Sequence, residues 1–423
     1  MAAKKDSEII IIGAGAAGLL AADALSRAGK KCLILEANNR IGGRIFTVLE
    51  KNHFPVELGA EFIHGRPRVT WDLLKRFRMK AVPVSNVRWR QNGDGFRQDS
   101  SSWERLSQTL SQLKSAKKDR SFAEAMAEMK IPPSAKKMAE NFVRSYHAAD
   151  IRKISVNDLV FQQKTSGDEG MQGYRIVEGY GALLGNLAAA LPSRSIRLNQ
   201  TVREIRWSRD GAEILTQKSR FKAARVLVTV PLGVLKYPGA LVFRPALRAK
   251  EAALKKLEMG FAARISLFFS APFWQNGGRG NPYGFFQAEG AAIPIWWTGL
   301  FKDSPVLTGW MGGPETQELN DFNLFIRHGL ESLSGLFGLD QKLLKLKLRR
   351  AYFHDWNSDP FSRGAYTYCG VGGMPAREEF ARPVERTIFF AGEATDNSGE
   401  ASTVAGAFLS GLRAAKEIIA SAI

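Results

Sequence analysis

The feature that most constrains this chain is the stretch from Glu8 to Arg44. It opens with four consecutive isoleucines, turns through closely spaced glycines into an apolar helix, and continues into a second apolar strand that ends on Glu36. The glycines of the turn are Gly13, Gly15 and Gly18, in the order G-x-G-x-x-G. A strand, a glycine-rich turn, a helix and a second strand form a βαβ unit, so we predict an α/β fold with a Rossmann-type domain.

These residues have physical roles in binding a dinucleotide. Gly13 permits a tight turn, Gly15 lets a pyrophosphate approach the backbone, and Gly18 lets the helix pack closely on the strand. The helix N-terminus offers free N–H donors and a partial positive charge. Glu36 follows at about the 20-residue interval at which an acidic side chain accepts hydrogen bonds from a ribose. The stretch therefore predicts a bound dinucleotide and leaves its identity open.

The chain carries a strong positive charge whose distribution matters more than its size. Its 423 residues have a formal net charge of +19 and a pI near 9.9, which can indicate a nucleic-acid or anionic-membrane partner. However, the basic residues are scattered through amphipathic segments such as 341–350 (QKLLKLKLRR). Solvated helix faces are the favoured interpretation, so we expect no nucleic-acid partner and leave a homodimer open.

Cysteine usage and hydropathy exclude several classes of site. The only cysteines are Cys32, inside the second strand of the glycine-rich unit, and Cys369, so neither a disulfide framework nor a metal site is predicted. No run of about 18 apolar residues suggests a membrane span. Residues 1–24 imitate a secretory signal, but Asp6 and Glu8 interrupt its basic region and cleavage would destroy the glycine motif. We therefore expect a retained N-terminus and a cytoplasmic protein.

The middle of the chain departs from nucleotide-domain character. A helical period dominates from Thr70 to about Gln163, with Pro132-Pro133 as a stop and Ser134 as a new N-cap. Further on, strand and helix signals alternate. We predict helices at 182–191 and 322–337, and strands at 195–207, 224–230, 264–269, 295–300 and 306–311. Aromatic residues concentrate in this region, and most of their rings are expected in the core. They include Phe273, Trp274, Trp296, Trp297, Trp310 and Trp356.

The tail returns to nucleotide-domain character, with a strand predicted at 387–391 and a helix at 403–421. We expect both to fold back beside the first βαβ unit. Each of the two predicted domains is therefore made of segments that are not contiguous in the sequence. The cofactor-binding domain comprises residues 1–80, 172–240 and 369–423, and an α+β substrate-binding domain of mixed sheet and helices comprises 81–171 and 241–368.

Four motifs in order carry a family resemblance. They are the 9–44 segment with its second Gly-Gly-Arg, the E-x-G-A-x-x-I-H-G run at 57–65, the W-x-x-D-P-x-x-x-G-x-Y run at 356–366, and the F-A-G-E…T-V-x-G-A-x-x-S-G run at 390–411. The sequence resembles the flavin-dependent amine oxidases of the monoamine and polyamine oxidase group. That group also includes histone lysine demethylases and L-amino-acid oxidases.

The resemblance implies FAD as the cofactor. It implies that Glu36 holds the adenosine ribose, that Arg44 lies beside the cofactor, and that Val202 contacts the adenine. Thr403 and Val404 would begin a helix aimed at the flavin pyrimidine, where its N-terminus would stabilise negative charge. The expected cofactor-binding residues are Gly13, Gly15, Ala16, Ala17, Gly18, Glu36, Ala37, Arg40, Gly42, Gly43, Arg44, Gly59, Ala60, Glu61, Val202, Trp356, Gly392, Glu393, Thr403 and Val404.

The resemblance also implies hydride transfer from the carbon beside an amine nitrogen to flavin N5. The resulting imine would be hydrolysed, and oxygen would be reduced to H2O2. Tyr366 matches one wall of the family's aromatic cage, and Thr403 stands where monoamine oxidases have a second tyrosine. His64 matches a position near the substrate entrance and could accept a proton from an ammonium group. Glu61 is a weaker candidate for binding a cationic amine.

Arg264 departs from the family pattern. It stands where much of the family has a lysine that holds a water at flavin N5. An arginine is always charged and presents a fixed fork of donors, so it could replace that water, bind a substrate carboxylate or form an ion pair. We therefore expect catalytic roles from Arg264, Tyr366, His64 and Thr403, and leave the electron acceptor open between oxygen and another molecule.

Two other functions stay open on the sequence. A C–C desaturase of the phytoene or protoporphyrinogen type shares the N-terminal motif and would use an acceptor other than oxygen. The other is a non-catalytic flavin-binding protein. In that case Arg264, and an aromatic cage with Tyr366 on one side but Thr403 on the other, would be signs of lost catalysis. Among amines, the sequence does not distinguish a monoamine, a polyamine or an amino acid.

The first prediction concerns the attachment of the cofactor. Some members of the family attach flavin to a cysteine just before the residue that matches Tyr366, but this chain has Ala365 there and Cys369 four residues further on. We therefore expect non-covalent FAD. Acid precipitation of the purified protein should release the yellow colour into the supernatant, and colour retained in the pellet would contradict the expectation.

Overall fold

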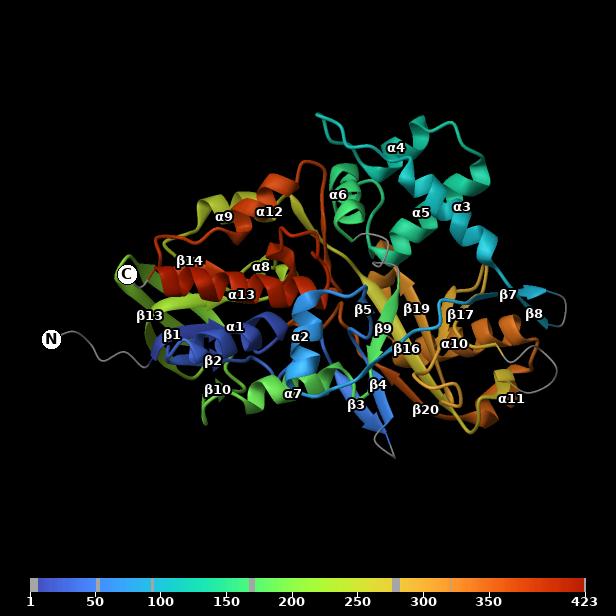
Figure 1. Ribbon diagram of the computed structural model, residues 1–423, viewed down its shortest axis with the longest axis horizontal. Coiled ribbons are helices and arrows are strands. Elements are labelled where there is room, and N and C mark those ends of the chain that lie inside the picture. Colours follow the sequence, from blue (N-terminus) through green and yellow to red (C-terminus); the bar gives the residue numbers. More distant parts are fainter. Residues whose placement is uncertain are drawn as a thin grey trace.

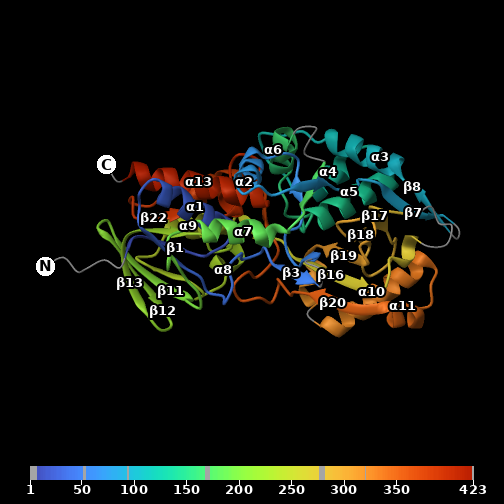
Figure 2. The ribbon, with the colours of Figure 1, turned by 60° about the horizontal axis from the view of Figure 1, so that its bottom comes forward.

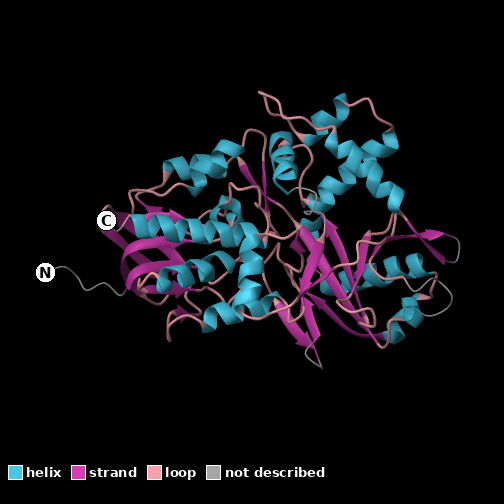
Figure 3. Ribbon diagram, in the orientation of Figure 1, coloured by secondary structure: helices cyan, strands magenta, loops and turns pink. Residues whose placement is uncertain are grey.

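The computed structural model describes residues 7–50, 54–92, 95–166, 172–275, 282–319 and 321–421. These residues form two large β-sheets that lie in opposite halves of the molecule, each with helices packed on it (Figure 1). Figure 3 shows the strands of the two sheets separated by loops and short elements. The predicted fold class, a Rossmann-type α/β unit combined with a mixed region of sheet and helices, is confirmed.

The first sheet contains the glycine-rich unit, in the strand order β10-β2-β1-β13-β12-β11-β14, with β22 paired to β13. β1 is parallel to β2 and β13, and β13 is parallel to β22. Because β22 comes from the tail, both ends of the chain contribute to one sheet. The strands are β1 Ser7–Ile12, β2 Cys32–Leu35, β10 Ile196–Arg197, β11 Val202–Ser208, β12 Gly211–Thr216, β13 Arg220–Val228, β14 Val242–Arg244 and β22 Ile388–Phe390.

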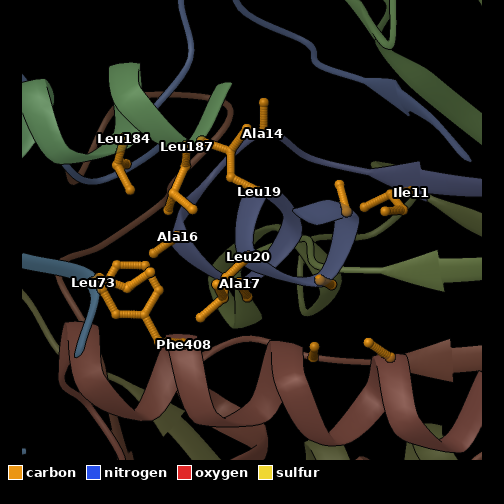
Figure 4. Packing of buried hydrophobic residues seen from close by; sticks show 14 of the residues in the cluster. Ile11, Ala14, Ala16, Ala17, Leu19, Leu20, Leu73, Leu184, Leu187 and Phe408 are labelled. Atoms are coloured by element: carbon orange, nitrogen blue, oxygen red, sulfur yellow. The ribbon is translucent and has the colours of Figure 1, made fainter. Parts of the chain in front are cut away.

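Three helices cover one side of this sheet, α1 (Ala16–Arg27), α7 (Tyr180–Ala189) and α13 (Val404–Ala420), as Figure 2 shows. Figure 4 shows α1 between the other two, with Leu184 and Leu187 of α7 on one side and Phe408 of α13 on the other. The close contact of α1 with α13 requires a glycine, because a Cβ on Gly411 would lie 2.4 Å from the carbonyl oxygen of Ala17.

The second sheet has the strand order β20-β16-β19-β18-β17-β7-β8. Helix α10 (Phe322–Phe337) packs on it through Phe325, Leu333 and Phe337, which share a buried cluster with Ile265 and Leu267. The predicted helix at 322–337 is therefore confirmed. The strands are β7 Arg88–Asn92, β8 Gly95–Gln98, β16 Ala262–Phe269, β17 Phe285–Gln287, β18 Ile295–Thr298, β19 Val306–Gly312 and β20 Leu348–Phe353. Helix α11 (Gln341–Lys347) directly precedes β20 in the chain.

The remaining elements connect or flank the two sheets. A helical cluster, at the top of Figure 1, consists of α3 Ser100–Ser111, α4 Phe122–Glu128, α5 Pro133–Tyr146 and α6 Val156–Ser166. The other helices are α2 Arg68–Arg76, α8 Leu232–Leu235, α9 Arg248–Leu254 and α12 Met374–Ala381. The small sheets pair β3 Thr47–Glu50 with β4 Phe54–Glu57, β15 Leu257–Met259 with β21 Thr367–Cys369, and β9 Gly173–Ile176 with both β5 Ile63–His64 and β6 Ala81–Pro83. No helix within the described ranges is long and apolar enough to cross a membrane.

The predicted helical region from Thr70 to Gln163 is wrong between residues 81 and 98. β6 pairs with β9, and β7 pairs in parallel with β17, so both strands are held by segments far along the chain. Residues 348–350 likewise join β20, which pairs with β16, instead of continuing a solvated helix. Long-range pairing overrides local propensity at these places.

Ser134 is not an N-cap. Helix α5 begins at Pro133 with Pro132 in the capping position, and no side chain caps it. A proline suits the first helical position because its missing N–H would have no partner there and its φ is already helical. The predicted stop at Pro132-Pro133 is therefore a helix start, two residues earlier than a Ser134 N-cap would give.

We predict that replacing Gly18 with alanine destabilises the protein, because an added Cβ would lie 2.1 Å from the carbonyl oxygen of Gly13. The expected loss in the free energy of unfolding is about 2 kcal/mol or more, as for an overpacked core. Gly185 in α7 is the matched control, because nothing lies within 4 Å of its added Cβ. Gly185→Ala should leave stability unchanged or raise it by up to about 1 kcal/mol. Urea unfolding of both variants tests this, and equal stabilities would contradict the packing described here.

Candidate active site

A cavity of about 2310 Å³ begins at the carboxyl ends of β1 and β2 and extends toward β18, β19 and the helical cluster. Its volume is well above the roughly 300–1,000 Å³ of ordinary small-molecule pockets. Ligand sites in open α/β sheets lie outside the carboxyl ends of the strands. The cavity therefore has the position and the size for a dinucleotide together with a second molecule.

The glycine motif forms one end of the cavity. Gly13, Gly15, Ala16 and Ala17 line it, and the first N–H groups of α1 have no acceptor within the helix. Gly13 has φ +108°, a conformation that favours glycine. At Gly15 nothing lies closer to an added Cβ than 3.9 Å, so this backbone is open to a ligand.

Glu36 lies at the same end and is almost fully buried. Its two carboxylate oxygens accept hydrogen bonds from the backbone N–H groups of Ala14 at 2.7 Å and Asn38 at 2.8 Å. Burial raises the pKa of Glu36, while these N–H groups act in the opposite direction. The carboxylate is thus fixed at the cavity wall, and each oxygen retains a lone pair for a ligand hydroxyl.

Two expected cofactor-binding residues, Gly18 and Arg40, do not line the cavity. Gly18 packs against Gly13. The guanidinium of Arg40 donates to the carbonyl oxygens of Ile41, Gly43 and Ile45 at 3.2, 2.9 and 3.2 Å. Arg40 therefore holds the turn that carries Gly42 and Gly43 in place, and it acts on the cavity through that turn.

Arg44 and Glu393 join the two ends of the chain. Nη1 of Arg44 donates to Oε1 of Glu393 at 2.8 Å and to the carbonyl oxygen of Ala365 at 2.8 Å. The other carboxylate oxygen of Glu393 accepts from the hydroxyl of Thr367 at 2.6 Å. Both members of the ion pair line the cavity, so the pair fixes two distant segments at one wall.

Helix α13 directs its N-terminus into the cavity. Thr403 is its N-cap: the hydroxyl accepts from the N–H of Gly406 at 3.0 Å and donates to the carbonyl oxygen of Glu400 at 2.7 Å. Thr403 and Val404 line the cavity. Because the hydroxyl of Thr403 already makes two hydrogen bonds, its role is to fix the helix end and the partial positive charge there.

These residues fit a flavin dinucleotide. The open backbone at Gly15, the two helix N-termini and the fixed carboxylate of Glu36 provide sites for phosphates, flavin and ribose along one wall. Further expected cofactor-binding residues line the same cavity. They are Ala37, Gly42, Gly43, Gly59, Ala60, Glu61, Val202, Trp356 and Gly392.

Aromatic side chains line the part of the cavity beyond Arg44. The rings of Tyr366 and Trp310 are nearly parallel, at 4°, with centroids 6.4 Å apart, and the hydroxyl of Tyr366 donates to the carbonyl oxygen of Tyr146 at 2.6 Å. Trp297 lies next to Trp310, with centroids 6.4 Å apart. The expectation that most of these rings are core is confirmed, since Trp274, Trp296, Trp297 and Trp356 are buried, whereas Trp310 is half-buried. Trp297, Trp310 and Trp356 also line the cavity.

Arg264 is buried and bonded to protein groups. Its Nη2 lies 2.5 Å from Oε2 of Glu61, and its Nη1 donates to the carbonyl oxygen of Gly59 at 2.8 Å. Arg175 contacts the other carboxylate oxygen of Glu61 at 2.6 Å, and the indole N–H of Trp297 donates to Glu61 at 3.1 Å. Burial acts to raise the pKa of Glu61, but the two guanidinium groups outweigh it and lower that pKa. The site therefore holds two buried cations on one carboxylate.

His64 lies in the same part of the cavity, with its Nδ1 3.4 Å from the hydroxyl oxygen of Tyr146. Burial lowers the pKa of His64 below its usual range. The imidazole is therefore neutral at pH 7 and can accept a hydrogen bond from a ligand or from the phenol.

The sequence gives no signal for Tyr146 and Arg88, which line the cavity, or for Arg175, which does not line it but contacts Glu61 of its wall. Arg175 lies in the short strand β9 and Tyr146 ends α5. Arg88 lies in β7, which local periodicity assigns to a helix. No spacing within the sequence relates these residues to the glycine motif, because the sheets and helices bring them together only in space.

The chain matches the family model described as flavin containing amine oxidoreductase over residues 16–419. It is 28% identical to lysine-specific histone demethylase 1 homolog 2 of Arabidopsis thaliana, over 98% of this chain and 58% of that protein. It is also 28% identical to polyamine oxidase 4 of Oryza sativa subsp. japonica, over 97% of this chain and 88% of that protein. Thus the chain spans little more than half the length of the demethylase homolog.

Solved structures with the same fold include a wild-type putrescine oxidase bound to putrescine, with a TM-score of 0.83 and 21% identity over 98% of this chain and 99% of that one. Another is cyclohexylamine oxidase from Brevibacterium oxydans, with a TM-score of 0.82 and 19% identity over 99% of each chain. At these identities the likeness concerns the fold.

We predict that Glu61→Gln lowers the free energy of unfolding by about 3–5 kcal/mol at neutral pH, because two buried guanidinium groups lose their counter-ion. The double variant Glu61→Gln/Arg264→Met should be more stable than Glu61→Gln alone. A double-mutant cycle by urea unfolding measures this coupling. The exposed pair Glu204–Arg206, at a similar 2.6 Å, is the matched control and should show no coupling beyond error.

The same cycle should depend on pH with a defined sign. Because the pKa of Glu61 is lowered on folding, its stabilising contribution is present above the unfolded carboxyl pKa of about 4.3 and is lost as the pH falls through the lower folded value. A cost of Glu61→Gln that grows on acidification would contradict the assignment.

Proposed function

The chain belongs to the family of flavin-containing amine oxidoreductases, and we propose from this that it is an FAD-dependent oxidase of the C–N bond of a small-molecule amine. The observation that carries the proposal is a single cavity lined by Gly13 and Gly15 of the glycine motif, by the Arg44–Glu393 pair and by Tyr366. A dinucleotide site and electron-rich ring faces in a single cavity suit the oxidation of an amine.

The proposed division of labour follows the two sheets. Residues 1–80, 172–240 and 369–423 bind the cofactor, and residues 81–171 and 241–368 bind the substrate. In support, the glycine-rich unit, β10 to β13 and β22 fall in the first group, whereas β7, β8 and β16 to β20 fall in the second. Since β14 pairs with β11, the boundary near residue 240 moves to about residue 244.

The proposed reaction converts the C–N single bond of the amine into an imine, which water hydrolyses to a carbonyl product and a free amine or ammonia. When bound, FAD would supply the acceptor for the hydride that the carbon gives up, and O2 would carry the two electrons away as H2O2. The chain's own residues bind the amine in its neutral form, orient it and exclude water.

In this proposal Tyr366 and Trp310 present ring faces to the amine, and Trp297 closes the wall beside them. Neutral His64 accepts a hydrogen bond from the amine. Arg264 is held by Glu61 and Gly59, so it positions the loop at 59–61 beside the cofactor and does not bind substrate. Thr403 acts by fixing the N-terminus of α13.

We predict that at least one amine class bleaches the flavin absorbance under anaerobic conditions and that admission of air then yields one H2O2 per flavin. The panel comprises putrescine, spermidine, benzylamine, cyclohexylamine and L-leucine. Tyr366→Ala should slow flavin reduction by about tenfold or more, because the amine loses a ring wall. Tyr366→Phe retains the ring and is the matched control, with at most a small effect. No bleaching by any of the amines would overturn the proposal, and bleaching without H2O2 would move the acceptor from oxygen to another molecule.

A further inference from the structure

Arg88 presents to the cavity a guanidinium group that forms no direct ion pair within the described residues, although the charge of the neighbouring Asp99 acts favourably on it. Its central carbon lies 4.1 Å from the ring centroid of Trp103 and 5.5 Å from that of Phe285. Within the described residues it makes only these ring contacts, and no hydrogen bond or ion pair. Burial lowers the pKa of the Arg88 guanidinium, while the neighbouring Asp99 and Tyr146 act in the opposite direction.

The nearby acidic groups are already paired with another arginine. The carboxylate of Asp99 lies 3.1 Å from Nε of Arg90, and the carboxylate of Glu289 lies 3.2 Å from its Nη2. Arg105 also lines the cavity, with its Nη2 donating to the hydroxyl of Ser102 at 3.1 Å, and no carboxylate of the described residues lies within ion-pair distance of it. Around Arg88 the cavity lining therefore includes three arginines, Arg88, Arg90 and Arg105, against the two carboxylates of Asp99 and Glu289. Net positive charge would repel the second ammonium group of a diamine and attract an anion.

The buried arginines beside the aromatic wall do not share this property. Arg264 and Arg175 both contact the carboxylate of Glu61. Their charge is partly neutralised and their orientation is fixed by the protein. Arg88 is thus a cavity arginine whose guanidinium fork is not held by a protein carboxylate, so it can bind a planar anion.

A single tyrosine relates Arg88 to the aromatic wall. The backbone carbonyl of Tyr146 accepts from the hydroxyl of Tyr366 at 2.6 Å. The phenol at the other end of Tyr146 is close enough to Arg88 to influence its charge. Phe285 gives a second connection, because its ring centroid lies 5.5 Å from the guanidinium carbon of Arg88 and 6.1 Å from the ring centroid of Trp297 in the aromatic wall.

We propose that Arg88 binds an anionic group, a carboxylate or a phosphate, at the far end of the amine substrate, so that the preferred substrate is an amine with an anion several bonds from its nitrogen. This inference rests on the proposed function and narrows its substrate class. The anion would provide the direct ion pair that Arg88 lacks, and charge-assisted hydrogen bonds to a guanidinium fork are the strongest of their kind.

Binding of ligands that cannot be oxidised as amines tests the site without turnover. Hexanoate, hexyl phosphate and hexan-1-ol are titrated by calorimetry into the FAD-loaded protein and into its Arg88→Met, Arg88→Lys and Arg327→Met variants. Arg327 is exposed on α10, outside the cavity, and is the matched control. We expect at least one anion to bind Arg88→Met at least tenfold more weakly than the unaltered protein, with Arg88→Lys between them. Arg327→Met should equal the unaltered protein, and hexan-1-ol should not distinguish the variants. The stronger of the two anions identifies the head group. Equal binding of both anions to Arg88→Met and the unaltered protein, or no binding to either, would overturn the inference.

A second arm measures flavin reduction by 6-aminohexanoate, hexylamine and 1,6-diaminohexane, which share one alkyl chain. The expected order of kcat/KM is aminohexanoate, then hexylamine, then diamine, and Arg88→Met should lower the first at least tenfold while raising the last. The two arms separate the two proposals. If hexylamine reduces the flavin but Arg88→Met binds the anions as tightly as the unaltered protein, the amine oxidase proposal is retained and the anion site is rejected. If anion binding is weakened in Arg88→Met but no amine reduces the flavin, the anion site is retained and the amine oxidase proposal is rejected.

Discussion

The structure depends on a contact between the two ends of the chain. Arg44 and Glu393 form an ion pair across a separation of 349 residues, and the carboxylate is almost fully buried. A buried carboxylate without its cation would be costly, so the pair requires the tail to return to the glycine-rich unit. The packing of α13 on α1, which only a glycine at 411 permits, imposes the same arrangement. Together these contacts place two helix N-termini at one cavity.

The charges that line the cavity differ from those expected for the substrates after which some of its relatives are named. Polyamine and putrescine oxidases are named after polycationic substrates, whereas here the cavity lining around Arg88 carries more arginines than carboxylates. Glu61, which lies beside the aromatic wall, is shared by two guanidinium groups. The fold positions the cavity wall but the side chains determine its field, so the family's fold does not by itself fix the charge of the ligand that the cavity favours.

Local sequence patterns were sufficient to predict the secondary structure of a segment where the segment that it packs against lies nearby in the sequence. The βαβ unit at 9–44 and helix α10 at 322–337 have strong periodicity and nearby partners, and both were predictable. Residues 81–98 were not, since β6 and β7 are strands only through β9 and β17. Arg40 shows the same limit at a single residue: its motif position suggested contact with a cofactor, but its guanidinium is used on the carbonyls of its own turn.

The sequence alone determined that a dinucleotide-type βαβ unit exists and that four family motifs occur in order, because glycine spacing and β-branched runs act over a few residues. Only the tertiary structure decided which aromatic rings face the cavity, that Arg264 is held by Glu61, and that Arg88 is left without a direct ion pair. The physical reason is that burial and charge neutralisation are properties of a side chain's spatial neighbours. Here those neighbours come from β7, β9, β16 and α5, which no local pattern relates to one another.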